Sequence, residues 1–187
     1  SLGRAFGLTF RRILPLIGCP SSGQNAQNAN GTGSSAPAIV APAFNADTAF
    51  SYLKKQVAFG PRVSGTPGHK AQLEWMRDFL NARADTVAIH TFTHRHTGTD
   101  KPLEMANVFA RFNPQSAERV LLVAHWDTRP PADQDDDENR DTPIPGANDG
   151  ASGVALLLEM ANVLKRQKPP IGVDLLLVDG EDYGPDS

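Results

Sequence analysis

Three groups of residues in this chain combine carboxylates, an imidazole and glycines in a pattern that suits metal-assisted catalysis. They are His125-Trp126-Asp127, residues 146–153 with Asp149, and residues 179–184 with Glu181 and Asp182. Imidazole and carboxylate are ligands of catalytic zinc, which uses three protein ligands and keeps one position open. Of two adjacent acids, one can bind metal while the other transfers protons, because the two tasks need opposite proton affinities.

A plainer interpretation exists for each group taken alone. Asp149 could be only the N-cap of the helix that follows it, and Glu181 and Asp182 could be only a solvated turn. The placement of the three groups favours a shared site. Two of them directly follow apolar runs, and the third opens the segment between those runs.

The elements around these groups predict that they meet at one edge of a sheet. Residues 120–124 and 173–178 are apolar runs, interrupted only by Asp174, and such runs are typical of strands buried on both faces. The apolar segment from about 151 to 167 predicts a helix, which Pro169-Pro170 ends. Strand, helix and strand at this spacing form a βαβ unit with parallel strands, and ligands bind beyond the carboxyl ends of such strands.

Two amphipathic helices and two further strands are predicted upstream. The first helix begins at Asn45 or Asp47, and the second has Thr66 as its N-cap and Pro67 at its first position. The expected apolar stripes are Phe50, Leu53 and Val57 in the first helix, and Leu73, Met76 and Leu80 in the second. Strands are predicted from residue 86 and over 105–112. The fold class is therefore α/β, as a three-layer α/β/α sandwich with a mixed, largely parallel sheet over residues 45–187.

The composition fits one α/β domain with a hydrophobic core. The chain has 187 residues, 40% of them hydrophobic and 21% charged, and a formal net charge of −3. These values exclude collagen, a disulfide-stapled miniprotein and a polytopic membrane protein. Slight acidity, without a block of Lys or Arg beyond the N-terminus, argues against nucleic acid as the main partner.

The first 44 residues differ from the rest. Leu16-Ile17-Gly18-Cys19 resembles a bacterial lipobox, in which the cysteine receives the lipid anchor. We expect residues 1–19 to be a lipoprotein leader and residues 20–44, rich in Ser, Gly and Asn, to be a flexible tether. The protein would then be exported, as a periplasmic or membrane-anchored lipoprotein. The alternative is a frayed tail whose cysteine is incidental.

The three motifs together resemble the zinc aminopeptidase-like (M28) superfamily, and more closely the animal-type glutaminyl-peptide cyclotransferases of bacteria. The similarity covers about residues 45–186 and includes the loop 59–65. The resemblance implies a zinc-exopeptidase-like fold, Asp149 and Asp182 as zinc ligands, and Glu181 as the catalytic general base and acid. His125 corresponds to the histidine that binds a second metal in two-zinc aminopeptidases, and is no ligand in single-zinc cyclases.

Two departures from the family pattern matter. Aminopeptidases of the family usually carry Glu-Glu in the last motif, whereas this chain has Glu181-Asp182, as the bacterial cyclases do. The family also places a further acid and a histidine ligand downstream. We therefore expect the third zinc ligand beyond residue 187, and interpret the chain as the N-terminal portion of a larger catalytic domain.

The resemblance implies a zinc-dependent glutaminyl-peptide cyclotransferase. Such an enzyme uses one zinc ion and converts the N-terminal glutamine of a peptide or protein to pyroglutamate, with release of ammonia. The first alternative is an M28 aminopeptidase with two zinc ions, in which Asp149 bridges and His125 binds the second ion. The second alternative is an inactive binding lipoprotein on the same scaffold.

Three smaller features have two interpretations each. Trp126, next to His125, is expected to line the substrate pocket or simply to pack. His90, His94 and His96 share a strand face and could bind a metal, although a polar sheet face is favoured. The acidic run 133–141 could hold calcium, although it lacks the glycine turn of a dedicated loop and a solvated surface loop is favoured.

Overall fold

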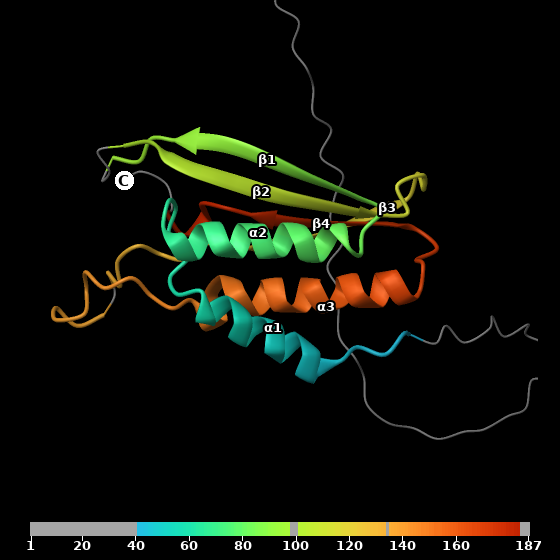
Figure 1. Cartoon of the computed structure of the whole chain (residues 1–187), viewed down its shortest axis with the longest axis horizontal. Helices are drawn as coiled ribbons and strands as arrows, with labels where there is room; N and C mark the ends of the chain where they lie inside the picture. Colours follow the sequence, from blue (N-terminus) through green and yellow to red (C-terminus); the bar gives the residue numbers. More distant parts are fainter. Residues whose placement is uncertain (1–40, 98–100, 134, 184–187) are drawn as a thin grey trace, which may run out of the picture. The chain divides into compact units, whose positions relative to one another are not determined.

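The computed structural model of the chain describes residues 41–97, 101–133 and 135–183. In chain order its main elements are α1 (Ala46–Ala58), α2 (Pro67–Asn81), β1 (Thr86–His94), β2 (Leu103–Phe112), β3 (Arg119–His125), α3 (Gly153–Arg166) and β4 (Gly172–Val178) (Figure 1). The predicted leader with Cys19, and the predicted tether up to residue 40, lie outside the described residues. Among the described residues, none of the helices has the length and apolarity needed to cross a membrane.

Both upstream helices begin at the residues that the sequence predicts. The Asn45 side chain accepts a hydrogen bond from the backbone N–H of Thr48 at 2.9 Å, which caps α1. The Thr66 hydroxyl accepts one from the N–H of His69 at 3.3 Å, and Pro67 occupies the first position of α2. These bonds satisfy N–H groups that lack a partner within the helix. The two helix starts are therefore confirmed.

The inner face of α1 differs from the predicted stripe. Phe50 is 58% exposed, so its expected place in the stripe is wrong, whereas Gln56 is fully buried. The amide of Gln56 donates to the carbonyl of Ala151 at 3.0 Å. α1 therefore packs on α3 and on the backbone before it, where a buried amide has partners, rather than on the apolar sheet.

The sheet has the order β1-β2-β4-β3 and is mixed. β3 and β4 pair in parallel, as the βαβ prediction requires, with Ala124 opposite Leu177. β1 pairs with β2 and β2 with β4 in the antiparallel sense. The α/β class is confirmed, but the sheet of the described residues is mostly antiparallel rather than largely parallel. The reason is that β1 and β2 form a hairpin, which needs no crossover helix.

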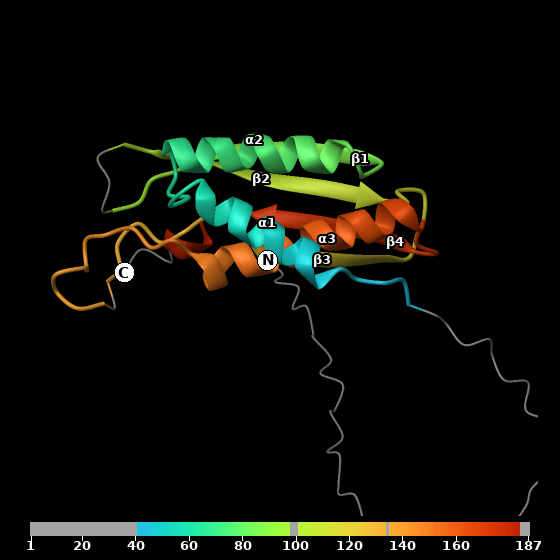
Figure 2. The ribbon, with the colours of Figure 1, turned by 60° about the horizontal axis from the view of Figure 1, so that its bottom comes forward.

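α2 and α3 cover the same face of this sheet (Figures 1 and 2). The register places Val108 opposite Leu177 and Ala110 opposite Leu175, so these residues point to one side. The buried core on that side consists of Met76, Phe79 and Leu80 of α2, Val154, Leu157, Leu158, Ala161 and Leu164 of α3, Val108, Ala110 and Phe112 of β2, Val173, Leu175 and Leu177 of β4, and Trp126. Helices and sheet therefore share one core.

The opposite face of the sheet is open on the β3 side. Leu121 and Val123 are 53% and 54% exposed. They alternate with Leu122 and Ala124, which pack against the core. The expectation that this run is buried on both faces is therefore wrong for the described residues. An apolar run indicates that a face can be covered, but it does not say which segment covers it.

Candidate metal centre

The predicted site residues meet at the carboxyl ends of the parallel strands. His125 is the last residue of β3, Asp149 lies at a kink in the segment before α3, and Glu181 begins a short 3₁₀ turn after β4. The Nε2 atom of His125 is 2.9 Å from Oδ1 of Asp149, and its Nδ1 atom is 3.8 Å from Oε2 of Glu181. Residues far apart in sequence thus form one cluster, as the βαβ topology predicts.

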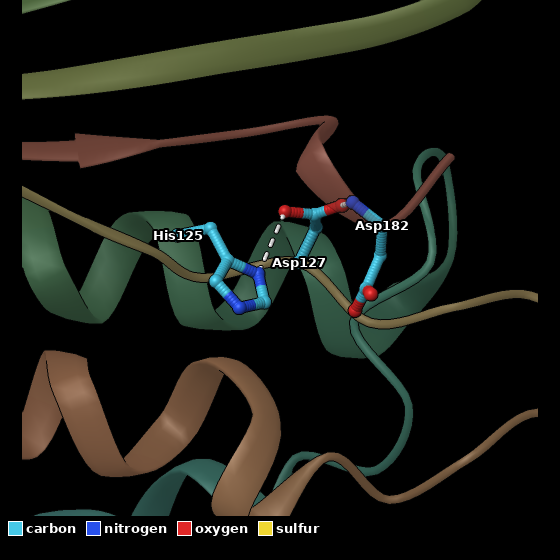
Figure 3. A group of neighbouring side chains, drawn as sticks. All are labelled: His125, Asp127 and Asp182. Carbon is cyan, nitrogen blue, oxygen red and sulfur yellow. Dashed lines mark hydrogen bonds and ion pairs between the residues drawn. The ribbon is translucent and has the colours of Figure 1, made fainter. Parts of the chain in front are cut away.

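Asp127 joins the two strand ends. Its carboxylate is fully buried and accepts hydrogen bonds from the backbone N–H groups of Glu181 at 3.3 Å and Asp182 at 3.0 Å. The same carboxylate lies 3.5 Å from Nδ1 of His125 (Figure 3). Sequence reasoning gave Asp127 no role. The available signal was its position two residues after His125, directly beyond a buried strand.

The two adjacent acids differ in the way that a metal ligand and a proton carrier must differ. Asp182 is 6% exposed, and its Oδ2 atom is buried without a hydrogen-bond partner in the structure. The side chain of Glu181 is 62% exposed. Since a buried carboxylate oxygen without a partner is costly, Asp182 is suited to a cation, while Glu181 is free to exchange protons.

The electrostatics of the cluster also favour a cation. The Asp127 carboxylate raises the pKa of His125 to about 9, against the opposing effect of burial. Burial, together with the negative charges of Asp149 and Asp127, raises the pKa of Asp182 to about 6. Four carboxylates, including Glu181, therefore face one imidazolium, and a divalent ion would relieve their mutual repulsion.

The donor set fits zinc. Ligand atoms of His125, Asp127 and Asp182 lie within 4.8 Å of one another, and within residues 41–97, 101–133 and 135–183 this is the one group of that kind. Both oxygens of Asp127 also accept backbone N–H groups, whereas Oδ2 of Asp182 is buried without a hydrogen-bond partner, and Asp149 lies beside His125 at 2.9 Å. Imidazole and carboxylate oxygen are the usual partners of catalytic zinc.

The predicted alternatives elsewhere do not form such a group among the described residues. The group of close ligand atoms includes none of the strand histidines 90, 94 and 96, and none of the described acidic residues of the run 133–141. The ring of His90 instead stacks on that of Phe92, at 5.8 Å between centroids. This contact agrees with the interpretation in which these histidines lie on an ordinary sheet face.

The backbone before α3 brings Asp149 close to the end of β3. Asp149 has non-helical backbone angles, and Gly150 has a φ of +86°. A Cβ atom on Gly150 would lie 2.8 Å from the carbonyl oxygen of Asp127 and 3.3 Å from the His125 ring. Glycine at this position thus permits both the positive φ and the close approach.

Trp126 does not line the site. It is fully buried, its indole N–H donates to the carbonyl of Ala106 at 3.0 Å, and its ring stacks on that of His69 at 4.4 Å between centroids. The predicted role in a substrate pocket is therefore wrong. Successive side chains after a strand point to opposite sides, so His125 faces the site while Trp126 enters the core.

A hollow of about 450 Å³ opens beside Asp149 instead. Its lining consists of Arg129, Ala132, Asp133, Asp135, Ile144 and Asp149. Arg129 forms an ion pair with Asp133 at 2.9 Å within this lining. A ligand in this hollow would contact a predicted metal ligand directly.

The fold and the site define an α/β unit of the zinc-exopeptidase type. Residues 107–186 match the family model described as Peptidase family M28. The resemblance predicted from the three motifs is thereby confirmed.

Known proteins similar to the chain include cyclases and an aminopeptidase. The glutaminyl cyclase of Bacteroides thetaiotaomicron, solved with N-acetylhistamine, is 43% identical with a TM-score of 0.74, and the match covers 78% of this chain and 50% of that one. A leucine aminopeptidase precursor from the same species is 42% identical with a TM-score of 0.76, covering 80% and 52%. A glutaminyl-peptide cyclotransferase-like protein of Bos taurus is 31% identical over 132 residues, covering 64% and 32%. The chain thus spans about half the length of the solved relatives and a third of the curated one.

Proposed function

We propose that the chain forms part of a zinc-dependent glutaminyl-peptide cyclotransferase, which converts an N-terminal glutamine into pyroglutamate and releases ammonia. The contrast between Glu181 and Asp182 carries this proposal. One carboxylate is buried with an oxygen that lacks a partner, and its neighbour in sequence is exposed at the same cluster. Such a pair supplies a metal ligand and a general base side by side.

The residues divide the reaction between them. Asp149 and Asp182 would hold one zinc ion, which when bound polarises the γ-carbonyl of the glutamine. Glu181 takes a proton from the α-amine, whose nitrogen attacks the γ-carbon. The bond from that carbon to the amide nitrogen then breaks, and Glu181 returns the proton to the departing ammonia. The exposed carboxylates of Asp149 and Glu181 also attract the protonated α-amine of the incoming peptide.

One observation favours cyclisation over hydrolysis. The Glu181-Asp182 pair has the form that the family resemblance associates with bacterial cyclases. The similarity to a solved cyclase, at 43% identity over 78% of the chain, agrees with this candidate, and the 42% identity to an aminopeptidase precursor is equally compatible with the other. The Glu181-Asp182 pair therefore carries the preference for glutamine-initiated peptides as substrates.

A two-zinc aminopeptidase is the second candidate, and one contact favours it. His125 Nε2 and Asp149 Oδ1 lie 2.9 Å apart, so both atoms face the same point and could share a second ion. The similarity to a leucine aminopeptidase precursor agrees with this candidate. In that case Glu181 would direct water to the peptide bond and the first residue would be released.

A comparison of two peptides separates the candidates. The zinc-loaded chain is incubated with a Gln-initiated and a Leu-initiated peptide of otherwise identical sequence, and the products are identified by mass. Loss of the mass of one ammonia molecule from the first peptide alone supports the cyclase. Release of free leucine without pyroglutamate would overturn it.

A further inference from the structure

A buried arginine lies directly behind the metal centre. Arg62 is fully buried, and its guanidinium donates to the carbonyls of Pro145, of Gly146 at 2.7 Å and of Trp126 at 3.5 Å. Burial lowers the pKa of Arg62 to about 10, so the group remains charged at neutral pH. Its donors therefore bind backbone oxygens from two separate segments, one before Asp149 and one after β3.

The backbone of Arg62 is joined to the same region. Its N–H donates to the hydroxyl of Thr128 at 2.8 Å, and its carbonyl accepts the N–H of Thr128 at 3.4 Å. Thr128 is itself fully buried, one residue after Asp127. Both the main chain and the side chain of Arg62 thus fix the segment that leaves β3.

The carbonyl of Gly146 is the point where the Asp149 loop is fixed. It accepts the guanidinium of Arg62 and also the N–H of Ala151 at 3.2 Å, which closes the loop that carries Asp149. A Cβ atom on Gly146 would lie 2.3 Å from Cγ2 of Thr128 and 2.9 Å from Nη2 of Arg62. The loop thus packs closely on Thr128 and on the guanidinium at this point, so the guanidinium is part of its support.

We propose that Arg62 is a positioning residue of the metal centre, whose fork of donors holds the Asp149 loop against the end of β3 and so keeps Asp149 beside His125. The part of this inference that concerns zinc rests on the proposed function. Arg62 does not contact the metal ligands and acts through the backbone of their loops. A planar fork can bind carbonyls from two segments together, whereas an ammonium group cannot reproduce that geometry.

Arg62→Lys separates geometry from charge, because it keeps the positive charge and removes the fork. Arg119→Lys is the matched control. Arg119 also donates to backbone carbonyls, those of Asn113 at 2.9 Å and Ser116 at 3.4 Å, but at the opposite end of β3. Zinc affinity is measured on the full chain by competition with a chromophoric chelator. Amide hydrogen exchange of residues 146–152 is measured on the same chain without metal.

We expect Arg62→Lys to weaken zinc binding by about tenfold or more, as loss of outer-shell support does. We also expect it to speed exchange over residues 146–152, while Arg119→Lys changes neither. Unchanged zinc affinity together with unchanged exchange in Arg62→Lys would overturn the proposal. If the wild-type chain binds no zinc, the proposed function fails, and the exchange measurement still decides the role of Arg62.

A milder variant covers the case in which Arg62→Lys does not fold. Thr128→Val keeps the shape of the side chain and removes the oxygen that binds the Arg62 N–H. We expect faster exchange over residues 146–152 and a smaller loss of zinc affinity than in Arg62→Lys. Exchange equal to that of the wild type in Thr128→Val would contradict the proposal.

Discussion

The two ends of the parallel β3–β4 pair both gather charged side chains, but in opposite states. Near the start of the strands, Asp174 binds Arg119 at 2.8 Å and Arg111 at 3.2 Å. This ion cluster also explains the one polar residue in the apolar run of β4. At the other end, the carboxylates of Asp182 and its neighbours face one another with a single imidazole between them.

The pKa values express this difference. The hydrogen bond with Arg119, aided by Arg111, lowers the pKa of Asp174. Burial and neighbouring carboxylates raise the pKa of Asp182 to about 6. Carboxylates paired with guanidinium groups stabilise the fold. Carboxylates that repel one another lower its stability, and such a cluster is typical of a functional site.

The largest expected effect is on turnover. Glu181→Gln removes the proposed proton carrier and keeps the side chain's size, so we expect turnover to fall by about 10²- to 10⁴-fold with zinc content unchanged. Glu118→Gln, at an exposed acid at the opposite end of β3, serves as the control and should leave turnover intact. Product formation and metal content are measured on the same samples. Retained turnover in Glu181→Gln would refute its assignment.

The second largest expected effect is on zinc affinity, which should differ between variants at the two ends of the β3–β4 pair. Asp182→Asn removes a proposed zinc ligand, and we expect it to weaken zinc binding by more than about 100-fold, beyond the loss typical of outer-shell partners. Asp174→Asn, which breaks the satisfied cluster, should leave zinc affinity within about twofold, because distant sites act independently. Chelator competition measures both. Equal losses of zinc affinity in the two variants would contradict the assignment of the metal centre to the Asp182 end alone.

The stability of the metal-free chain should change in opposite directions. Asp182→Asn removes one of several repelling charges, and we expect the free energy of unfolding to rise by about 1–2 kcal/mol. Asp174→Asn leaves two guanidinium groups without their partner, and we expect a fall of about 1–3 kcal/mol. Urea unfolding at neutral pH measures both values. A fall in both variants would remove the contrast.

The smallest expected effect is on pH dependence. The folded-state pKa of Asp174 lies below its ordinary value of 3.8, so its contribution to stability is present above about pH 4 and is lost as the pH falls through the lowered pKa. The difference in unfolding free energy between the wild type and Asp174→Asn should therefore shrink in acid. Urea titrations at neutral and acidic pH, at fixed salt, check this sign. A difference that grows in acid would contradict it.

Local signals predicted most of the framework. The caps at Asn45 and Thr66, the parallel βαβ unit and the meeting of His125 with Asp149 follow from short-range chemistry and from the rule on strand ends. The roles of Asp127 and Arg62 were missed because each depends on partners more than 50 residues away. Hydrogen bonds between such distant segments leave no periodic trace in the sequence.

The burial of single side chains was the weakest part of the prediction. Of the two interpretations of Trp126, the pocket depends on its being next to His125, yet neighbours beyond a strand face opposite ways and Trp126 packs in the core. Phe50 was assigned to the inner stripe of α1, where Gln56 lies instead. In both cases hydrophobicity alone could not tell which face would meet another element, because that depends on the tertiary arrangement.

The open face beside β3 has a consequence for the handling of the chain. β3 is an edge strand of the described sheet, and Val120, Leu121 and Val123 are exposed along it. An unpaired edge with apolar side chains is a template for intermolecular strand pairing. At high concentration we therefore expect the chain to self-associate through this edge. Leu121→Lys should slow the association, because a charge on an exposed strand disfavours pairing, and it should not affect the metal centre at the end of β3.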